Sequence, residues 1–160
     1  MVENPKFTNA QLFDFVNKAG KLTYAGGGEE VPNPERPEHH ELVFSEPDWE
    51  YRDSYTGHFR SHGTELVKFR GQIVWGNSYR GGMVDGRDAM ADMTFNFLKK
   101  AMSTDEEGFQ SFRGPHEFSE GDWRYEYQQE GDINEFKGHE KIYNRGELIF
   151  YHEAIGGSIR

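Results

Sequence analysis

The sequence predicts an α+β protein that is mainly antiparallel β structure, built from two α-β4 repeats related by pseudo-two-fold symmetry. Three observations predict this class: an internal duplication, two amphipathic helical segments, and long stretches in which apolar and polar residues alternate. Eight strands in one curved sheet, or in a partly closed barrel, with two helices packed on them would bury both helical stripes.

The duplication is clearest in residues 44–57 and 118–131, which read FSEPDWEYRDSYTG and FSEGDWRYEYQQEG and share seven of fourteen residues. FDFVNKA at 13–19 likewise matches FNFLKKA at 95–101. These matches place repeat 1 at about residues 8–83 and repeat 2 at about 86–159. The repeat continues across the segment 25–41, which is rich in Gly, Pro and charge, so we interpret this segment as a loop and expect a single domain, 1–160.

The first helix is predicted from a capping box at Thr8 and Gln11, in which each side chain can bond the other's backbone N–H. An apolar stripe follows, and Gly20 is expected to end the helix; the stripe consists of Leu12, Phe15, Val16 and Ala19. The second helix is expected to start after Asp85 and to run to about Met102. It should bury Met90, Met93, Phe97, Leu98 and Ala101.

The remaining sequence alternates with a period of two, which is typical of strands that bury one face. Each repeat therefore contributes four sequentially paired strands. The inward positions that we predict are Trp49, Tyr51, Asp53 and Tyr55 on one strand, Ile73, Trp75, Asn77 and Tyr79 on another, and Leu148, Phe150, His152 and Ala154 in the second repeat. Arg70-Gly71 and Arg145-Gly146 are predicted to form tight hairpin turns, in which glycine supplies a positive φ.

Composition excludes several functional classes. The chain has 160 residues, a net charge of −10, 15% aromatic residues and no cysteine. Thiol chemistry and cysteine-based metal sites are therefore excluded, and the acidic surface argues against nucleic acid as a partner. The chain has no apolar run long enough to span a membrane, and its first six residues have neither a basic start nor an apolar stretch. We expect a cytoplasmic protein.

Candidate binding residues come from comparing the two repeats. Residues that both repeats share are explained by the fold, whereas inward polar residues that differ are candidates for function, because a buried polar group without a partner is costly. Asp53, Asn77 and His152 meet this criterion, with Tyr55, Trp75 and Tyr79 near them in the pattern. Glu65 and Glu140 occur in both repeats and are expected to point the same way.

A pocket of aromatic side chains with a few convergent polar groups is typical of small-molecule sites. Small-molecule binding between the two repeats is therefore the leading hypothesis, and a polar network that only stabilises the sheet is its structural alternative. A second hypothesis is a hydrolase or isomerase that uses a carboxylate–His pair, although no nucleophile motif accompanies these residues. A third is an interaction module that forms a homodimer through a sheet edge.

No cofactor is predicted. His58 and His62 are spaced like metal ligands, but the glycines beside them favour an exposed hairpin, so we predict no metal site. The glycines at 81 and 86 have the spacing of a phosphate-binding loop, but Arg87-Asp88 follows where that loop needs Lys and Ser or Thr.

Several motifs occur in an order that resembles a known family: KLTYAGGG (21–28), D-W-x-Y-x-D-x-Y-x-G (48–57), G-x-E-x-V (63–67), W-x-N-x-Y-x-G (75–81), RGP (113–115), G-D-W-x-Y (121–125) and GGSI (156–159). The resemblance, over about residues 11–160, is to an uncharacterised prokaryotic family, domain of unknown function 5680. It implies no reaction. Its members stand alone or follow a helix-turn-helix domain, and we expect a stand-alone member because repeat 1 begins at about Thr8. The resemblance adds Lys21, Thr23 and Tyr24 as site candidates, with Arg36.

Overall fold

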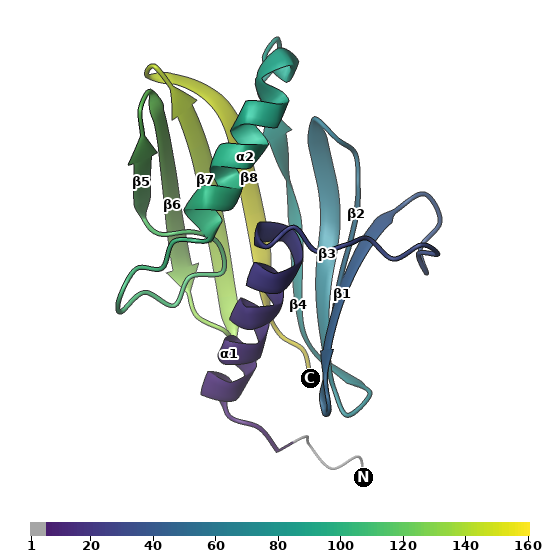
Figure 1. Ribbon diagram of the computed structural model, residues 1–160. Helices are drawn as coiled ribbons and strands as arrows, with labels where there is room; N and C mark the ends of the chain where they lie inside the picture. The colour runs from purple at the N-terminus through teal and green to yellow at the C-terminus, as the bar shows by residue number, and fades with distance from the viewer. Residues whose placement is uncertain (1–5) are drawn as a thin grey trace.

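The fold is one antiparallel sheet with two helices on the same face (Figure 1). The structure is a computed structural model, and it describes residues 6–160. The expectation about the extreme N-terminus involves residues 1–5, which lie outside this range. The eight strands have the order β1-β2-β3-β4-β8-β7-β6-β5. The predicted α+β class, the two helices and the sequential strand pairing are confirmed.

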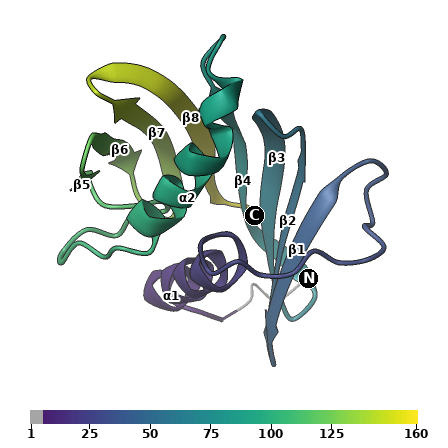
Figure 2. The same cartoon turned by 45° about the horizontal axis from the view of Figure 1, so that its top comes forward.

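The strands are β1 (His40–Glu46), β2 (Trp49–Thr56), β3 (Arg60–Phe69), β4 (Gln72–Met83), β5 (Glu117–Glu120), β6 (Trp123–Gly131), β7 (Glu135–Asn144) and β8 (Glu147–Ser158). The halves β1–β4 and β5–β8 join where β4 pairs with β8. The sheet curves around the helices but stays open, because β1 and β5 are its two edges and do not pair with each other (Figure 2). The prediction of a single sheet is therefore confirmed, and its alternative, a partly closed barrel, is not.

Helix α1 (Asn9–Gly20) begins at the predicted capping box of Thr8 and Gln11. Its whole predicted stripe is buried against the sheet. The α-helix ends at Gly20 as predicted, but Gly20 keeps a right-handed helical conformation and the chain continues as a π-helical turn, η1 (Lys21–Ala25). The wider turn carries Lys21 and Tyr24 to the edge of an inner cavity.

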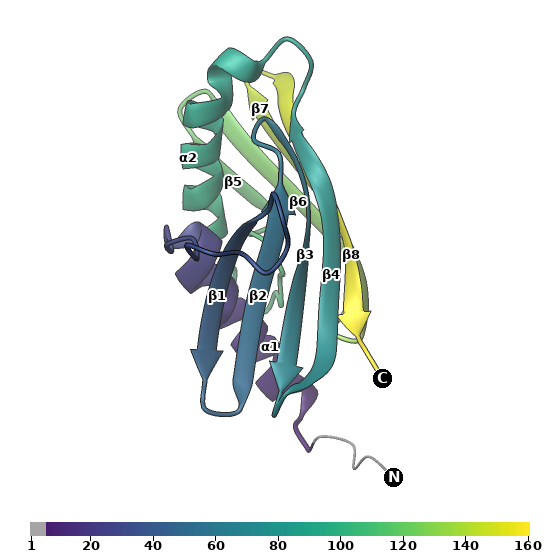
Figure 3. The same cartoon turned by 90° about the vertical axis from the view of Figure 1, so that its right-hand side faces the viewer.

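Helix α2 (Ala91–Met102) follows a short 3-10 turn, η2 (Asp88–Met90), so it begins later than predicted and ends where predicted. Phe97, Leu98 and Ala101 are buried as expected. Met93 is 57% exposed, so the prediction that it is buried is wrong. Both helices lie on the inner, concave face, as the side view shows (Figure 3). Among residues 6–160, no helix is long and apolar enough to cross a membrane.

The strand alternation is broken by two β-bulges. Val67 pairs with Trp75 but Lys68 pairs with Ile73, so Val74 is an extra residue on β4. Ile149 is extra on β8 in the same way. Both extra residues are buried, and the predicted inward positions Ile73 and Leu148 are 45% and 37% exposed. A bulge reverses the alternation on one side of it, and the two predictions before the bulges were therefore wrong.

The two Arg-Gly turns are confirmed. Arg70 and Gly71 have φ of 49° and 82°, and Arg145 and Gly146 have φ of 50° and 81°. Positive φ at both central residues is the type I′ geometry that matches the twist of a hairpin. Arg70 and Arg145 also form exposed ion pairs with Asp48 and Asp122.

A close approach of two strands positions His152. Gly81 on β4 is the ladder partner of His152 on β8. A Cβ added at Gly81 would overlap the carbonyl oxygen of Tyr151 and lie 2.5 Å from the Cα of His152. The absence of a side chain at this position lets β8 bring His152 against the inner face.

We expect Gly81→Ala to destabilise the protein by about 1–3 kcal/mol, because neither backbone atom can move aside cheaply. The control is Gly20→Ala. Gly20 is helical and a Cβ added there would meet no heavy atom within 4 Å, so this variant should be neutral or stabilising by up to about 1 kcal/mol. Urea denaturation of both variants checks this. Equal stabilities of the two variants would contradict the close approach.

Candidate functional site

The inner face of the sheet and the helices enclose a cavity of about 280 Å³. It lies between β2, β3, β4 and β8 on one side and α1, η1, α2 and the loop 103–116 on the other. Much of its wall is aromatic, and the aromatic residues are Tyr24, Tyr51, Tyr55, Tyr79, Phe59, Phe95, Phe112 and Phe150.

Two rows of polar residues cross the inner face. In the first row, Asp53 of β2 is the ladder partner of Glu65 of β3, which in turn is the partner of Asn77 of β4. In the second, Glu140 of β7 is the partner of His152 of β8. The period-two pattern predicted these inward positions correctly.

Glu65 and Asp53 are held by neutral hydrogen-bond donors. The Tyr51 hydroxyl donates to Glu65 Oε1 at 2.7 Å, and the Asn77 amide donates to Oε2 at 2.8 Å. The Tyr79 hydroxyl donates to Asp53 Oδ1 at 2.6 Å. Among residues 6–160, neither carboxylate forms an ion pair. The first row therefore brings two acidic groups together beside the cavity without a counter-ion.

This arrangement shifts the pKa of Asp53. Burial, and then the nearby charge of Glu65, raise the pKa of Asp53 from 3.8 to about 7, against the opposing effects of the Tyr79 hydrogen bond and of the Arg113 charge. At neutral pH the Asp53 carboxyl group is therefore divided between its charged and neutral forms.

Glu140 has the opposite environment. Arg113 donates to it twice, from Nε to Oε2 at 3.0 Å and from Nη2 to Oε1 at 2.7 Å, and the Tyr125 hydroxyl donates to Oε2 at 2.6 Å. Burial by itself would raise the pKa of Glu140, but the Arg113 guanidinium outweighs it and the pKa is lowered. Glu140 is fully buried and ionised, and its charge is balanced by Arg113.

His152 lines the cavity and is 5% exposed. Its ring lies against the Tyr79 ring, with 5.2 Å between the centroids. Burial, and then the charge of Arg113, lower the pKa of His152 to about 3, so the imidazole is neutral. Among the residues that the structure describes, neither ring nitrogen has a hydrogen-bond partner, and no ion pair joins His152 to Asp53, Glu65 or Glu140. The direct carboxylate–imidazole contact that the hydrolase or isomerase hypothesis expects is not formed.

The structure brings seven of the sequence candidates to the cavity wall: Lys21, Tyr24, Asp53, Tyr55, Glu65, Tyr79 and His152. Asn77 and Glu140 do not line the cavity themselves but bond residues that do: Asn77 donates to Glu65, and Glu140 accepts from Arg113. Trp75 is core: its indole donates to the Ile133 carbonyl at 3.1 Å and its ring stacks on Phe136. Thr23 bonds the Ala19 carbonyl inside the π-helical turn.

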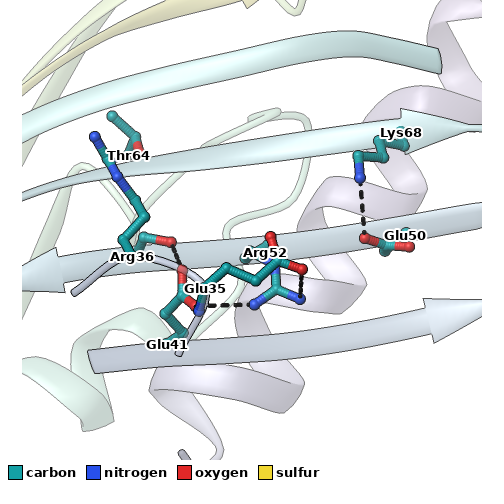
Figure 4. Close-up of polar contacts among 8 residues, drawn as sticks. Glu35, Arg36, Glu41, Glu50, Arg52, Thr64 and Lys68 are labelled. Carbon is teal, nitrogen blue, oxygen red and sulfur yellow. Dashed lines mark hydrogen bonds and ion pairs between the residues drawn. The ribbon is translucent and has the colours of Figure 1, made fainter. Parts of the chain in front are cut away.

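Arg36 lies on the opposite, outer face of the sheet, where its guanidinium donates to Thr64 Oγ1 at 3.2 Å (Figure 4). It belongs to the segment 26–39, which we call the strap. The strap is fastened by Glu41 of β1, whose buried carboxylate accepts from the Glu35 backbone N–H at 2.5 Å and pairs with Arg52 at 3.0 Å. Arg36 therefore does not contribute to the inner cavity.

Sequence reasoning missed Arg113, the only arginine at the cavity wall within residues 6–160. It lies in an irregular loop, so no periodicity marks it. Two signals could have found it: the RGP motif at 113–115, and the need of an inward Glu140 for a cationic partner.

His58 and His62 do not share a face. His58 borders the cavity, whereas His62 follows the outer-face alternation of β3 with Thr64. Within residues 6–160 no group of three or more His, Asp or Glu side chains could hold a metal ion.

The fold and site define a class: an α+β protein in which one antiparallel sheet and two helices enclose a small cavity with acidic and aromatic walls. The chain belongs to a family described as Domain of unknown function (DUF5680), whose model matches residues 38–159. The match starts just before β1, so α1 and η1 lie outside it. No curated protein and no solved structure matches the chain.

Proposed function

We propose that the protein binds a small organic molecule in the inner cavity. The observation that carries this proposal is the convergence of buried polar side chains, Asp53 and His152, on a cavity with aromatic walls. A polar network that served only stability would satisfy its members, whereas the imidazole of His152 faces the cavity without a partner.

The proposal is for binding rather than catalysis, because the contact between a carboxylate and His152 that would orient the imidazole as an acid or base is not formed. The interaction-module and homodimer hypotheses stay predictions, as does a cytoplasmic location.

We also propose that the two halves of the sheet derive from one duplicated α-β4 unit. Equivalent features in both halves support this: the Arg-Gly turns, the Asp–Arg pairs beside them and the two bulges.

A screen of metabolites by thermal shift tests the binding proposal. A ligand present at 100 times its Kd adds about 2.7 kcal/mol to stability, which corresponds to a rise of about 5–10 °C in Tm for a domain of this size. We expect such a rise for the wild type and a much smaller one for His152→Ala, each measured from its own Tm without ligand.

The control is His139→Ala, because His139 lies on the neighbouring strand β7, is exposed and is absent from the cavity wall. It should respond to the ligand like the wild type. Ligands that stabilise His152→Ala as much as the wild type would place binding elsewhere and overturn the proposal.

A further inference from the structure

Glu65 and Glu140 occupy matching positions in the two halves of the inner face but have different partners. Glu65 and Glu140 each accept a hydrogen bond from a tyrosine on the preceding strand, Tyr51 at 2.7 Å and Tyr125 at 2.6 Å. Glu140 also has the Arg113 guanidinium, whereas Glu65 has only the neutral amide of Asn77. The glutamate of one half is therefore in an ion pair, and among residues 6–160 the glutamate of the other half is not.

The half without this ion pair faces the cavity. Glu65 and Asp53 are direct partners in the β2–β3 ladder and both line the cavity. Asp53 Oδ1 accepts from Tyr79, while among residues 6–160 its Oδ2 has no donor. The first half carries an arginine in its own loop, Arg36, but this arginine bonds Thr64 on the outer face and forms no ion pair with Glu65.

The cations at the cavity wall are already engaged. Arg113 is paired with Glu140. Lys21 Nζ lies 2.5 Å from Asp105, and Lys99 Nζ lies 5.8 Å from the centroid of the Tyr24 ring. Within the described range, none of the three forms an ion pair with Asp53 or Glu65. An acidic pair with aromatic surroundings is left open to a cation from outside.

Building on the proposed function, we propose that the ligand of the inner cavity carries a protonated amine, which lies between Asp53 and Glu65. The ammonium group takes the role beside Glu65 that Arg113 has beside Glu140. Its N–H groups donate to Asp53 Oδ2 and to the unpartnered His152 imidazole, and the rings of Tyr55 and Tyr79 add cation–π attraction.

An independent observation supports a donor on the ligand. His152 is 5% exposed, lines the cavity and has no partner among residues 6–160. A neutral imidazole offers one nitrogen as an acceptor, which suits an ammonium N–H. The net charge of −10 also attracts cations to the molecule.

Binding of an ammonium group requires Asp53 to be ionised, so it is coupled to proton release. Asp53 shares the cavity wall with further titratable groups, and Glu41 on β1 also acts on it electrostatically. The groups at the cavity wall are Tyr51 and Tyr55 on β2, His58, Glu65 on β3, Tyr79 on β4, Lys21 and Tyr24 on η1, Lys99 on α2, Arg113 in the loop 103–116 and His152 on β8. Asp53 has a pKa of about 7 in this setting, and His152 is neutral throughout the range from pH 5.5 to 8.

The test compares three probes that share a ring and differ in charge: benzylamine, benzyl alcohol and benzoate. Isothermal titration calorimetry between pH 5.5 and 8 should give the tightest binding for benzylamine. Its Kd should fall about tenfold per pH unit below pH 7 and level off above it. Titrations at pH 6 in buffers of different ionisation enthalpy should show release of nearly one proton.

Asp53→Asn keeps the shape of the side chain and removes its charge, so it should weaken benzylamine binding at least tenfold and abolish the pH dependence. Glu153→Gln is the control, because Glu153 is the exposed neighbour of His152 and lies outside the cavity wall; it should bind like the wild type. Melting curves confirm that both variants are folded.

Benzylamine binding that is no tighter than that of the other two probes, or that survives Asp53→Asn unchanged, overturns this inference. The proposed function then stands if the metabolite screen finds a neutral or anionic ligand whose effect depends on His152. It falls as well if every ligand stabilises His152→Ala like the wild type.

Discussion

Replacing Arg113 by Met should destabilise the protein by about 3–5 kcal/mol at neutral pH, because it leaves the buried Glu140 carboxylate without its counter-charge. The Arg113 side chain is 13% exposed and that of Glu140 is fully buried, so water cannot substitute for the guanidinium. The two donated hydrogen bonds are lost with the charge. Chemical denaturation at pH 7 measures the effect.

The pH dependence of this loss has a definite sign. The wild-type pKa of Glu140 is lowered from 4.5, so the stability that the pair contributes is present above about pH 4.5 and is lost as the pH falls further. In Arg113→Met the carboxyl group takes up a proton more readily in the folded state. The stabilities of the two proteins should therefore converge in acid.

Two further variants make this prediction specific. Arg124→Met removes a half-exposed arginine paired with Glu126 and should cost less than about 1 kcal/mol. The double variant Arg113→Met with Glu140→Met replaces the ion pair by apolar side chains and should recover most of the stability. A cost for Arg113→Met as small as that for Arg124→Met would contradict the buried ion pair between Arg113 and Glu140.

Whereas Arg113→Met should destabilise the protein, Asp53→Asn should stabilise it above pH 7, by about 2–4 kcal/mol. The folded-state pKa of Asp53 is about 7 and its reference value is 3.8. Its contribution to stability is therefore fully present below about pH 4 and is lost as the pH rises to 7. Asparagine has no such titration, and its side-chain oxygen can still accept the Tyr79 hydroxyl.

Unfolding measured from pH 5 to 8 checks this second prediction: the wild type should lose stability over this range, and the variant should lose less. Asp122→Asn, in the exposed pair with Arg145, should change stability by no more than about 0.5 kcal/mol. If Asp53→Asn is less stable than the wild type at pH 8, Asp53 has a structural role. A stabilising result would mark it as a residue retained for function at a cost in stability.

The architecture could be predicted from the sequence because the patterns that indicate strands and turns occur several times along the chain. Alternation over eight or more residues, an Arg-Gly pair in each half and the Thr8 capping box each depend on local chemistry that the fold preserves. The exceptions have a local cause that alternation cannot show. An inserted bulge residue such as Val74 is apolar like its neighbours. The sequence pattern therefore does not show that the bulge turns Ile73 to the exposed face.

The site was predictable only where it lies on strands. Asp53, Tyr79 and His152 line the cavity, as predicted, because side chains along a strand alternate between its two faces. No comparable periodicity predicts which way a loop side chain points. Arg36 and Arg113 both lie in loops that lead into a half-sheet, yet one lies on the outer face and the other at the cavity wall. Arg36 bonds Thr64, which is 28 residues away in the sequence, and Arg113 bonds Glu140, which is 27 residues away. Contacts over such separations leave no local pattern in the sequence.

The strap has a further consequence for the edge of the sheet. An unpaired edge strand offers its backbone to other chains and promotes aggregation. On β1, the Glu41 carbonyl already accepts the Val31 N–H at 2.9 Å, while the Glu41 side chain holds Glu35. The strap thus occupies part of the backbone that a foreign strand would need. At the other edge, β5 is only four residues long and has a glutamate at each end. The protein protects one edge by covering it and the other by keeping it short and charged.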